Sequence, residues 1–299
     1  MIASIAAALA LQTAVPATTP ATEVPPPVRP ISASKIILVG DSTTAVIGGW
    51  GPSFCADHVT SFVACVNLAR GGRSSGSYFV EGSWDLALGE MSTPGFVATY
   101  VLIQFGHNDQ PGKPGRSTDL TTEFPVNLRR YVAETRAHGA IPVLLTPLTR
   151  RQFIDGQVQN DLEPWAATIR AVAEETGTPL VDLNASSVAA VQAMGPALAA
   201  RFAQASPSPE VSAALLNGTT IAAATGVPLT VLPTAPVAAP VLAPLTTQAQ
   251  ANAAVEPLGQ ARTSFDYTHL GRSGADFFAA MVTRDLMIAV PDLRRSLVP

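Results

Sequence analysis

Residues 35–43 read Lys-Ile-Ile-Leu-Val-Gly-Asp-Ser-Thr, and this stretch decides the fold class. Its uninterrupted apolar run stops at Gly40 and Asp41, which is typical of a short buried strand that ends in a turn. Because successive side chains of a strand point to opposite faces, a continuous apolar run indicates burial on both faces. Such strands occur in parallel sheets that helices cover on both sides.

Four similar apolar runs follow, at residues 62–68, 100–105, 141–146 and 179–183. Apolar residues recur at helical spacing in residues 118–138, 162–176 and 274–290. This alternation predicts an α/β protein, in which a three-layer α/β/α sandwich surrounds a five-stranded parallel sheet with right-handed crossovers.

Composition excludes several classes of function. Charged residues make up 13% of the 299 residues and hydrophobic residues 47%, which is enough for a large core. The net charge is −4 and no basic stripe exists, so we expect no nucleic-acid partner. No run of 18 uninterrupted apolar residues occurs, so we expect no membrane span. The four histidines and two cysteines lack metal-ligand spacing, and we expect neither a metal nor another cofactor.

The first 30 residues differ from the rest of the chain. A short apolar, Ala-rich stretch is followed by small residues and prolines, as in a signal peptide with a flexible leader, although no Lys or Arg precedes the apolar run. A merely disordered Ala-rich tail is the alternative. We predict export to the periplasm or the exterior. In that setting Cys55 and Cys65 are expected to form a disulfide, the alternative being two small buried hydrophobic side chains.

Residues 31–299 are predicted to form a single domain with an insertion at about residues 203–258. Between Arg201 and Glu256 the only charged residue is Glu210, and Ala, Pro, Thr and Val dominate. The prolines exclude a long helix there. We expect an insertion that packs irregularly over the domain, or a partly mobile flap.

Polar, glycine-rich turns follow the first three predicted strands: Gly-Asp-Ser-Thr at 40–43, Gly-Gly-Arg-Ser at 71–74 and Gly-His-Asn-Asp at 106–109. A fourth motif, Asp266-Tyr-Thr-His269, precedes the last predicted helix. The carboxyl ends of parallel strands are where open α/β sheets place ligands and reactive groups. Each motif alone also fits an ordinary turn, and we expect His107 to be structural.

Taken in this order, the motifs resemble those of the SGNH hydrolase superfamily, also called GDSL-type. The resemblance implies a flavodoxin-like sandwich and a serine esterase. It implies Ser42 as the nucleophile, with His269 as the base and Asp266 as its carboxylate partner. It also implies an oxyanion hole made by the N–H groups of Ser42 and Gly72 and the amide of Asn108, with Gly72 favoured over the adjacent Gly71.

The residues of these motifs are most similar to those of the rhamnogalacturonan acetylesterase branch of that superfamily. This implies removal of O-acetyl groups from a plant cell-wall polysaccharide, the pectic polymer rhamnogalacturonan. Other esterases of the superfamily, acting on acetylxylan, lipids or small esters, and a non-catalytic carbohydrate-binding relative are the alternatives. The tryptophans at 50, 84 and 165 can stack on sugars, and the arginines at 70, 73 and 116 can meet uronate carboxylates. For the tryptophans we favour burial in the core, and for each arginine we favour solvated surface charge.

A second candidate nucleophile is Ser74. Residues 72–76, Gly-Arg-Ser-Ser-Gly, match the G-x-S-x-G nucleophile turn of α/β-hydrolases, and Asp266 and His269 follow in the order of that family. Only two strands precede Ser74, however, and this interpretation leaves the motifs around Ser42 and Asn108 unexplained. We therefore favour Ser42.

Overall fold

The computed structural model describes residues 31–221 and 264–299. The predicted signal peptide and leader, and residues 222–258 of the predicted insertion, lie outside the described residues. None of the described helices is long and apolar enough to cross a membrane.

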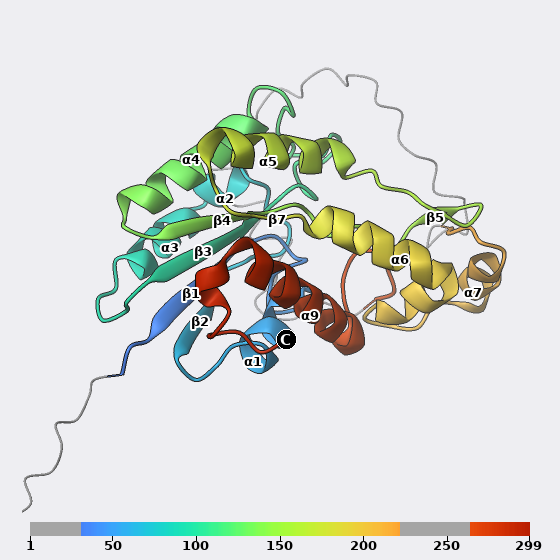
Figure 1. The fold of residues 1–299 in the computed structure, drawn as a ribbon. Helices are drawn as coiled ribbons and strands as arrows, with labels where there is room; N and C mark the ends of the chain where they lie inside the picture. The colour runs from blue at the N-terminus through green and yellow to red at the C-terminus, as the bar shows by residue number, and fades with distance from the viewer. Residues whose placement is uncertain (1–30, 222–263) are drawn as a thin grey trace, which may run out of the picture. The chain divides into compact units, whose positions relative to one another are not determined.

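A five-stranded parallel sheet forms the centre of the fold (Figure 1), as the apolar runs predict. Its strands stand in the order β2-β1-β3-β4-β7, and neighbours pair in parallel. Their bounds are Ser34–Gly40 for β1, Val63–Asn67 for β2, Thr99–Gln104 for β3, Ile141–Leu145 for β4 and Leu180–Val181 for β7. Since β1 lies between β2 and β3, the turns after these three strands meet at one edge of the sheet.

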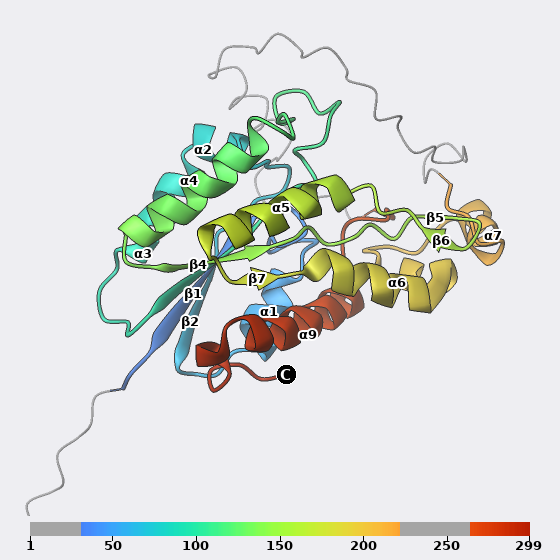
Figure 2. The same cartoon turned by 45° about the horizontal axis from the view of Figure 1, so that its top comes forward.

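Helices cover both faces of the sheet (Figure 2). One face carries α1 (Gly51–Asp57), α6 (Leu183–Ala199) and α9 (Arg272–Ala289). The other carries α2 (Ser77–Val80), α3 (Ser83–Met91), α4 (Phe124–Ala137) and α5 (Glu163–Thr176). The structure thus confirms the predicted three-layer α/β/α sandwich.

Strand β1 shows why its sequence requires two helical layers. Ile36 and Leu38 pack with α1, α6 and α9, whereas Ile37 and Val39 pack with α2 to α5. All four side chains are fully buried. Each contributes roughly 1.5–3 kcal/mol on transfer from water, so the strand that carries Ser42 at its end is firmly anchored.

The helices differ from prediction where turn chemistry decides their ends. The helix predicted at 118–138 begins only at Phe124, because the Asp119 side chain accepts hydrogen bonds from the N–H groups of Thr121 and Thr122 and forms a turn. Pro125 lies in the first turn of α4. Helix α6 was not predicted, and it contains a kink at Gly195-Pro196. Helix α5 ends, as predicted, at Gly177, whose φ is +59°.

The first part of the predicted insertion is regular rather than irregular. After the 3-10 turn η1 (Ala200–Phe202), Ser208 caps helix α7 (Pro209–Leu216) by accepting a hydrogen bond from the N–H of Val211. The chain then reaches Thr220, whose N–H donates to the carbonyl of Phe153. Phe153 belongs to the small hairpin of β5 (Phe153–Ile154) and β6 (Gln157–Val158).

The two cysteines pair, which confirms the disulfide alternative. Cys55 of α1 and Cys65 of β2 are joined with their Cα atoms 5.4 Å apart. The bridge ties a helix to the outer strand of the sheet. The three tryptophans are all core residues, at most 7% exposed, so they offer no platform for stacking on sugars.

Candidate active site

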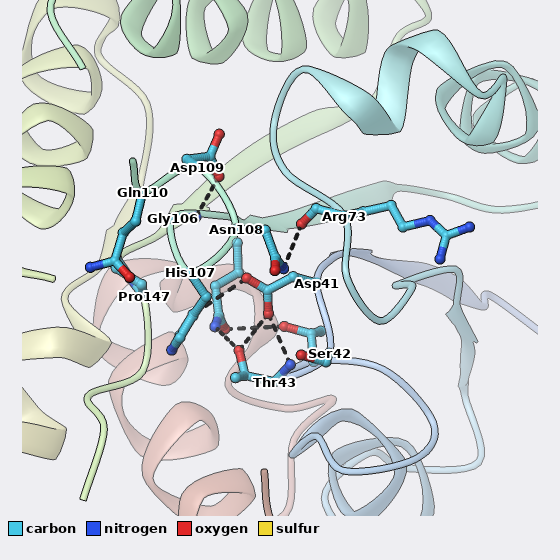
Figure 3. A network of polar contacts seen from close by, with 12 residues as sticks. Asp41, Ser42, Thr43, Arg73, Gly106, His107, Asn108, Asp109, Gln110 and Pro147 are labelled. Carbon is cyan, nitrogen blue, oxygen red and sulfur yellow. Dashed lines mark hydrogen bonds and ion pairs between the residues drawn. The ribbon is translucent and has the colours of Figure 1, made fainter. Parts of the chain in front are cut away.

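The turn after β1 presents Ser42. Asp41 is fully buried, and its Oδ1 accepts hydrogen bonds from the backbone N–H of Thr43 at 2.9 Å and from the hydroxyl of Thr43 at 2.8 Å (Figure 3). These bonds close the turn, and Ser42 between them is partly exposed. Gly40 is required just before, because a Cβ there would lie 2.6 Å from the carbonyl oxygen of Gln104.

Gln104, the last residue of β3, supports this turn from below. Its side-chain N–H₂ donates to the hydroxyl of Thr43 at 2.8 Å, and its Oε1 accepts from the indole of Trp50 at 2.8 Å and the hydroxyl of Thr44 at 3.2 Å. All these polar atoms are buried. Since buried polar groups are costly unless paired, the satisfied network fixes the backbone that carries Ser42.

His107 lies beside Asp41 rather than in the reactive group. Its Nδ1 is 3.3 Å from Asp41 Oδ2, and the side chain is 3% exposed. Burial lowers the pKa of His107 by more than the Asp41 carboxylate raises it, so the ring is neutral at pH 7. Burial raises the pKa of Asp41, but the contacts with His107 and Thr43 lower it by more, and the carboxyl stays ionised. This is the arrangement of a structural pair beneath the turn.

The turns after β2 and β3 are joined by Asp109 and Asn108. Asp109 Oδ1 accepts from the N–H and hydroxyl of Ser75, at 3.0 and 2.6 Å, while Oδ2 accepts from the N–H of Gly106 at 3.0 Å. The Asn108 side chain donates one N–H to the carbonyl of Arg73 at 3.0 Å (Figure 3). An amide has two N–H donors, so one remains for a ligand. Burial raises the pKa of Asp109 to about 6 despite its hydrogen bonds.

Gly72 occupies a conformation that suits glycine. Its φ is +76°, and a Cβ there would lie 3.1 Å from the guanidinium of Arg116. Its carbonyl accepts a hydrogen bond from Arg116 at 3.3 Å. Within residues 31–221 and 264–299, neither the N–H of Gly72 nor that of Ser42 donates to another protein group. Both can therefore serve a ligand.

The late Asp-x-x-His motif meets Ser42 at this edge of the sheet. His269 Nε2 lies 2.9 Å from Ser42 Oγ, and His269 Nδ1 lies 2.8 Å from Asp266 Oδ2. Asp266 Oδ1 accepts the N–H groups of Thr268 and His269 at 2.7 and 2.6 Å. Burial raises the pKa of Asp266, but these contacts, led by the bond with His269, lower it by more. An ionised carboxylate thus holds the ring nitrogen that faces away from the serine.

This geometry agrees with comparisons of the sequence. Residues 38–204, more than half of the chain, match the GDSL-like lipase/acylhydrolase family. The chain belongs to this family. It is 33% identical over 164 residues to the probable rhamnogalacturonan acetylesterase YesY of Bacillus subtilis, which covers 52% of this chain and 73% of that protein. It is 35% identical over 170 residues to the rhamnogalacturonan acetylesterase RhgT of Bacillus subtilis, covering 54% and 70%.

A solved structure has the same fold. The crystal structure of protein YxiM from Bacillus subtilis superposes with a TM-score of 0.53 at 20% identity, covering 87% of this chain. The chain spans 58% of the length of that chain. The family match and this fold confirm the resemblance to SGNH hydrolases and identify a carboxylic ester hydrolase.

Arg151 holds the loop that carries His269, a role that the sequence did not predict. It follows β4 and is 1% exposed. Its guanidinium donates to the backbone carbonyls of Asp266 at 3.1 Å, Thr268 at 3.1 Å and His269 at 2.8 Å. Burial lowers the pKa of Arg151 to about 10, so the group stays charged at neutral pH. One cation thereby holds three carbonyls of the loop that carries Asp266 and His269.

Two further contacts support that loop. The carbonyl of Gly48 accepts the N–H of Leu270 at 2.8 Å, and a Cβ at Gly48 would lie 3.2 Å from the His269 ring. Tyr267 packs with Val211 and Leu215 of α7, and its hydroxyl donates to the carbonyl of Ile221 at 2.7 Å. The ordered start of the predicted insertion therefore packs against the His269 loop.

Ser74, the alternative nucleophile, lies elsewhere. It is fully buried before α2, and its hydroxyl donates to Ser77 Oγ at 3.2 Å. The imidazole of His269 contacts Ser42 instead. Within the described parts of the chain, no group of three or more His, Cys, Asp or Glu side chains is arranged to hold a metal ion.

Proposed function

We propose that the protein is an exported serine esterase that removes O-acetyl groups from a plant cell-wall polysaccharide, namely rhamnogalacturonan. The observation that carries the proposal is the chain of hydrogen bonds from Ser42 Oγ through the His269 ring to Asp266. A serine hydroxyl becomes a nucleophile when a neighbouring imidazole can accept its proton and a carboxylate fixes the tautomer of that imidazole.

In the proposed first step, Ser42 Oγ attacks the carbonyl carbon of the acetyl group while His269 Nε2 takes the hydroxyl proton. The oxyanion that forms accepts hydrogen bonds from the N–H groups of Ser42 and Gly72 and from the free N–H of the Asn108 amide. Asp266 stabilises the imidazolium. The C–O bond to the sugar then breaks, and His269 returns the proton to the departing sugar oxygen.

In the second step, water attacks the acetyl-serine ester. His269 Nε2 accepts a proton from this water, and the same three donors hold the second oxyanion. The bond between the acetyl carbon and Ser42 Oγ breaks, the proton returns to the serine, and acetate leaves. The ionised Asp266 is available throughout because its pKa lies below the ordinary value.

The substrate and export proposals have separate supports. Two relatives with 33% and 35% identity bear the name rhamnogalacturonan acetylesterase. The disulfide between Cys55 and Cys65 fits an oxidising compartment, as does the apolar, Ala-rich beginning of the chain. A polymer substrate lies outside the cytoplasm, which agrees with export.

The test is acetate release from acetylated rhamnogalacturonan, acetylxylan and a series of p-nitrophenyl esters with acyl chains of increasing length. We expect the highest kcat/KM on rhamnogalacturonan and a strong preference for acetyl over long acyl chains. Ser42→Ala is the matched control and should release no acetate above background. Preference for acetylxylan or for long acyl chains would contradict the substrate, and glycan binding without hydrolysis would contradict the enzymatic proposal.

A further inference from the structure

The loop between β3 and α4 lies against the candidate site and is held at both ends. It leaves from Asp109, directly after Asn108, and returns at Thr118, whose N–H donates to the carbonyl of Asp109 at 3.0 Å and whose hydroxyl donates to its carboxylate. Inside the loop, the Ser117 hydroxyl accepts the N–H of Lys113 at 3.0 Å and donates to the carbonyl of Gln110 at 2.8 Å. The loop is therefore a fixed platform beside the turn that carries Asn108.

This platform carries two basic side chains, Lys113 and Arg116. The guanidinium of Arg116 lies over the turn after β2, 3.3 Å from the carbonyl oxygen of Gly72. Both residues are partly exposed. Within residues 31–221 and 264–299, no acidic side chain forms an ion pair with either of them.

The other basic residues near these turns are paired. Arg150 bonds to Asp161, and its Nη2 donates to Gln110 at 2.8 Å. Arg73 is buried against Glu81 at 2.8 Å, and Arg70 lies 4.0 Å from the same carboxylate. Of the three arginines that the sequence suggests for contact with uronates, only Arg116 has no acidic partner among the described residues.

Neighbouring charges and burial shift the pKa of Lys113. Burial, together with the nearby guanidinium groups of Arg150 and Arg116, lowers its pKa to about 8. Asp41, the neighbour of Ser42, and Asp161, the partner of Arg150, act on the same ammonium group in the opposite direction. Among the described residues neither carboxylate forms an ion pair with Lys113 or Arg116, so both cations can bind a ligand. A negatively charged ligand would supply the missing counter-charge.

We propose that Lys113 and Arg116 form a subsite for a carboxylate of the substrate, which makes the enzyme selective for acetyl groups on acidic, uronate-containing chains. The proposal rests on the proposed esterase function and deepens it. The carboxylate belongs to a uronate of the acetylated chain and lies over the Gly72 turn. Neutral acetylated chains such as acetylxylan lack this group and gain nothing from the subsite.

The experiment compares two forms of one substrate. An acetylated oligosaccharide that contains uronates is used as the free acid and after methyl esterification of its carboxylates, and acetate release is measured. We expect kcat/KM on the free acid to exceed that on the methyl ester by about 10-fold to 100-fold, the range for charge-assisted hydrogen bonds. The ratio should fall towards one as salt concentration rises, because salt screens partly exposed charges.

Variants test whether Lys113 and Arg116 cause the difference in kcat/KM between the free acid and the methyl ester. Lys113→Gln combined with Arg116→Gln should remove most of the preference for the free acid. Since Arg116 also contacts Gly72, Lys113→Gln alone is the second variant, and it should lower the ratio without that contact being touched. Arg295→Gln is the matched control, because this exposed arginine lies beyond the far end of α9, roughly 25 Å along the helix from His269.

Two results would overturn the subsite. One is an equal kcat/KM of the wild-type protein on both forms, and the other is an unchanged preference in both the double and the single variant. Hydrolysis of p-nitrophenyl acetate, lost in Ser42→Ala, tests the esterase itself. An active enzyme without preference for the free acid therefore refutes only the subsite, whereas an inactive wild-type protein refutes the proposed function.

Discussion

The two halves of the candidate site are held in different ways. Ser42 lies above buried polar side chains: Asp41, Thr43 and Gln104 are hydrogen-bonded to one another, His107 lies beside Asp41, and all four are at most 3% exposed. The side chains of His269 and Asp266 are 38% and 33% exposed. Their loop is held mainly through its backbone, by Arg151 from the segment between β4 and β5.

Ser42 is therefore positioned by the sheet, whereas His269 is positioned by contacts to its loop, of which those of Arg151 are the most numerous. The position of Ser42 follows from the sheet, because the ends of β1 and β3 are bonded together beneath it. The position of His269 depends on a buried guanidinium from a distant part of the sequence. Changes on the serine side should therefore affect folding and activity together, whereas changes in the His269 loop should affect activity first.

The largest expected effect follows from Asp266→Asn. The amide keeps the shape of the side chain but cannot stabilise an imidazolium, and it favours the wrong tautomer of His269. We expect kcat for ester hydrolysis to fall by about 10⁴-fold, as such changes do in serine hydrolases, with Tm almost unchanged. Kinetics and thermal unfolding of the same preparation check this. A loss of less than tenfold would contradict the role of Asp266.

Asn108→Ala should have the next largest effect. Removal of one oxyanion donor typically costs about 10²–10³ in kcat, and KM should change little because the donor acts on the transition state. We also expect Tm to drop, since the Asn108 amide joins the turns after β3 and β2 through the carbonyl of Arg73. A raised KM with an unchanged kcat would show that Asn108 binds substrate instead.

Arg151→Met tests directly how the loop that carries Asp266 and His269 is held. It leaves three loop carbonyls without their donor, and we expect kcat to fall about 10-fold to 100-fold well below the Tm, at a stability cost of about 3 kcal/mol. Arg151→Lys should restore kcat only in part, because an ammonium group cannot reproduce the guanidinium fork.

The control for this pair is Arg129→Met, which removes an exposed arginine that pairs with Glu175 on the surface. It should change neither kcat nor Tm measurably, since exposed ion pairs contribute little. Full activity in Arg151→Met would show that the His269 loop is held by other contacts, such as those of Gly48 and Tyr267.

On the serine side we expect an effect of pH on stability, with no assigned effect on kcat. The raised pKa of Asp109, about 6, means that its stabilising contribution is complete below about pH 4 and is lost as the pH rises through 6. His107 acts oppositely, because its lowered pKa adds stability above about pH 6.5 that is lost as the pH falls. Both effects are present in the wild-type protein.

Asp109→Asn isolates the first of them. The amide does not titrate, so from pH 4 to pH 7.5 the free energy of unfolding of the wild-type protein should fall relative to the variant by up to about 3 kcal/mol. Denaturant unfolding across this range measures the difference. Parallel pH profiles would contradict the raised pKa of Asp109.

Much of the fold can be predicted from the sequence for a clear reason. The apolar run at 35–39 and its counterparts form buried parallel strands. A continuous apolar run is a local signal, so such strands can be recognised without knowing which strands they pair with. Short helices such as α1 and α2 carry too few turns for a periodic signal. Helix α6 is rich in the small residues Ala and Ser, which give little apolar periodicity, and Gly195-Pro196 interrupts it, so its sequence carries only a weak helical pattern.

The site divides in the same way. Ser42, Gly72, Asn108 and the Asp266–His269 pair stand in recognisable motifs at strand ends, and the structure brings Ser42 and His269 together across 227 positions. Arg151 belongs to an Arg-Arg pair that looks like surface charge. Its burial depends on a contact with residues more than 100 positions away. The available hint was the low number of charged residues, which makes two adjacent arginines after a predicted strand unusual.

The most direct test of the account is to label the protein with a fluorophosphonate and locate the adduct by peptide mass spectrometry. We expect an adduct on Ser42, because His269 can activate that hydroxyl, and loss of the adduct in His269→Ala. An adduct on Ser74, or one on Ser42 that persists without His269, would contradict it.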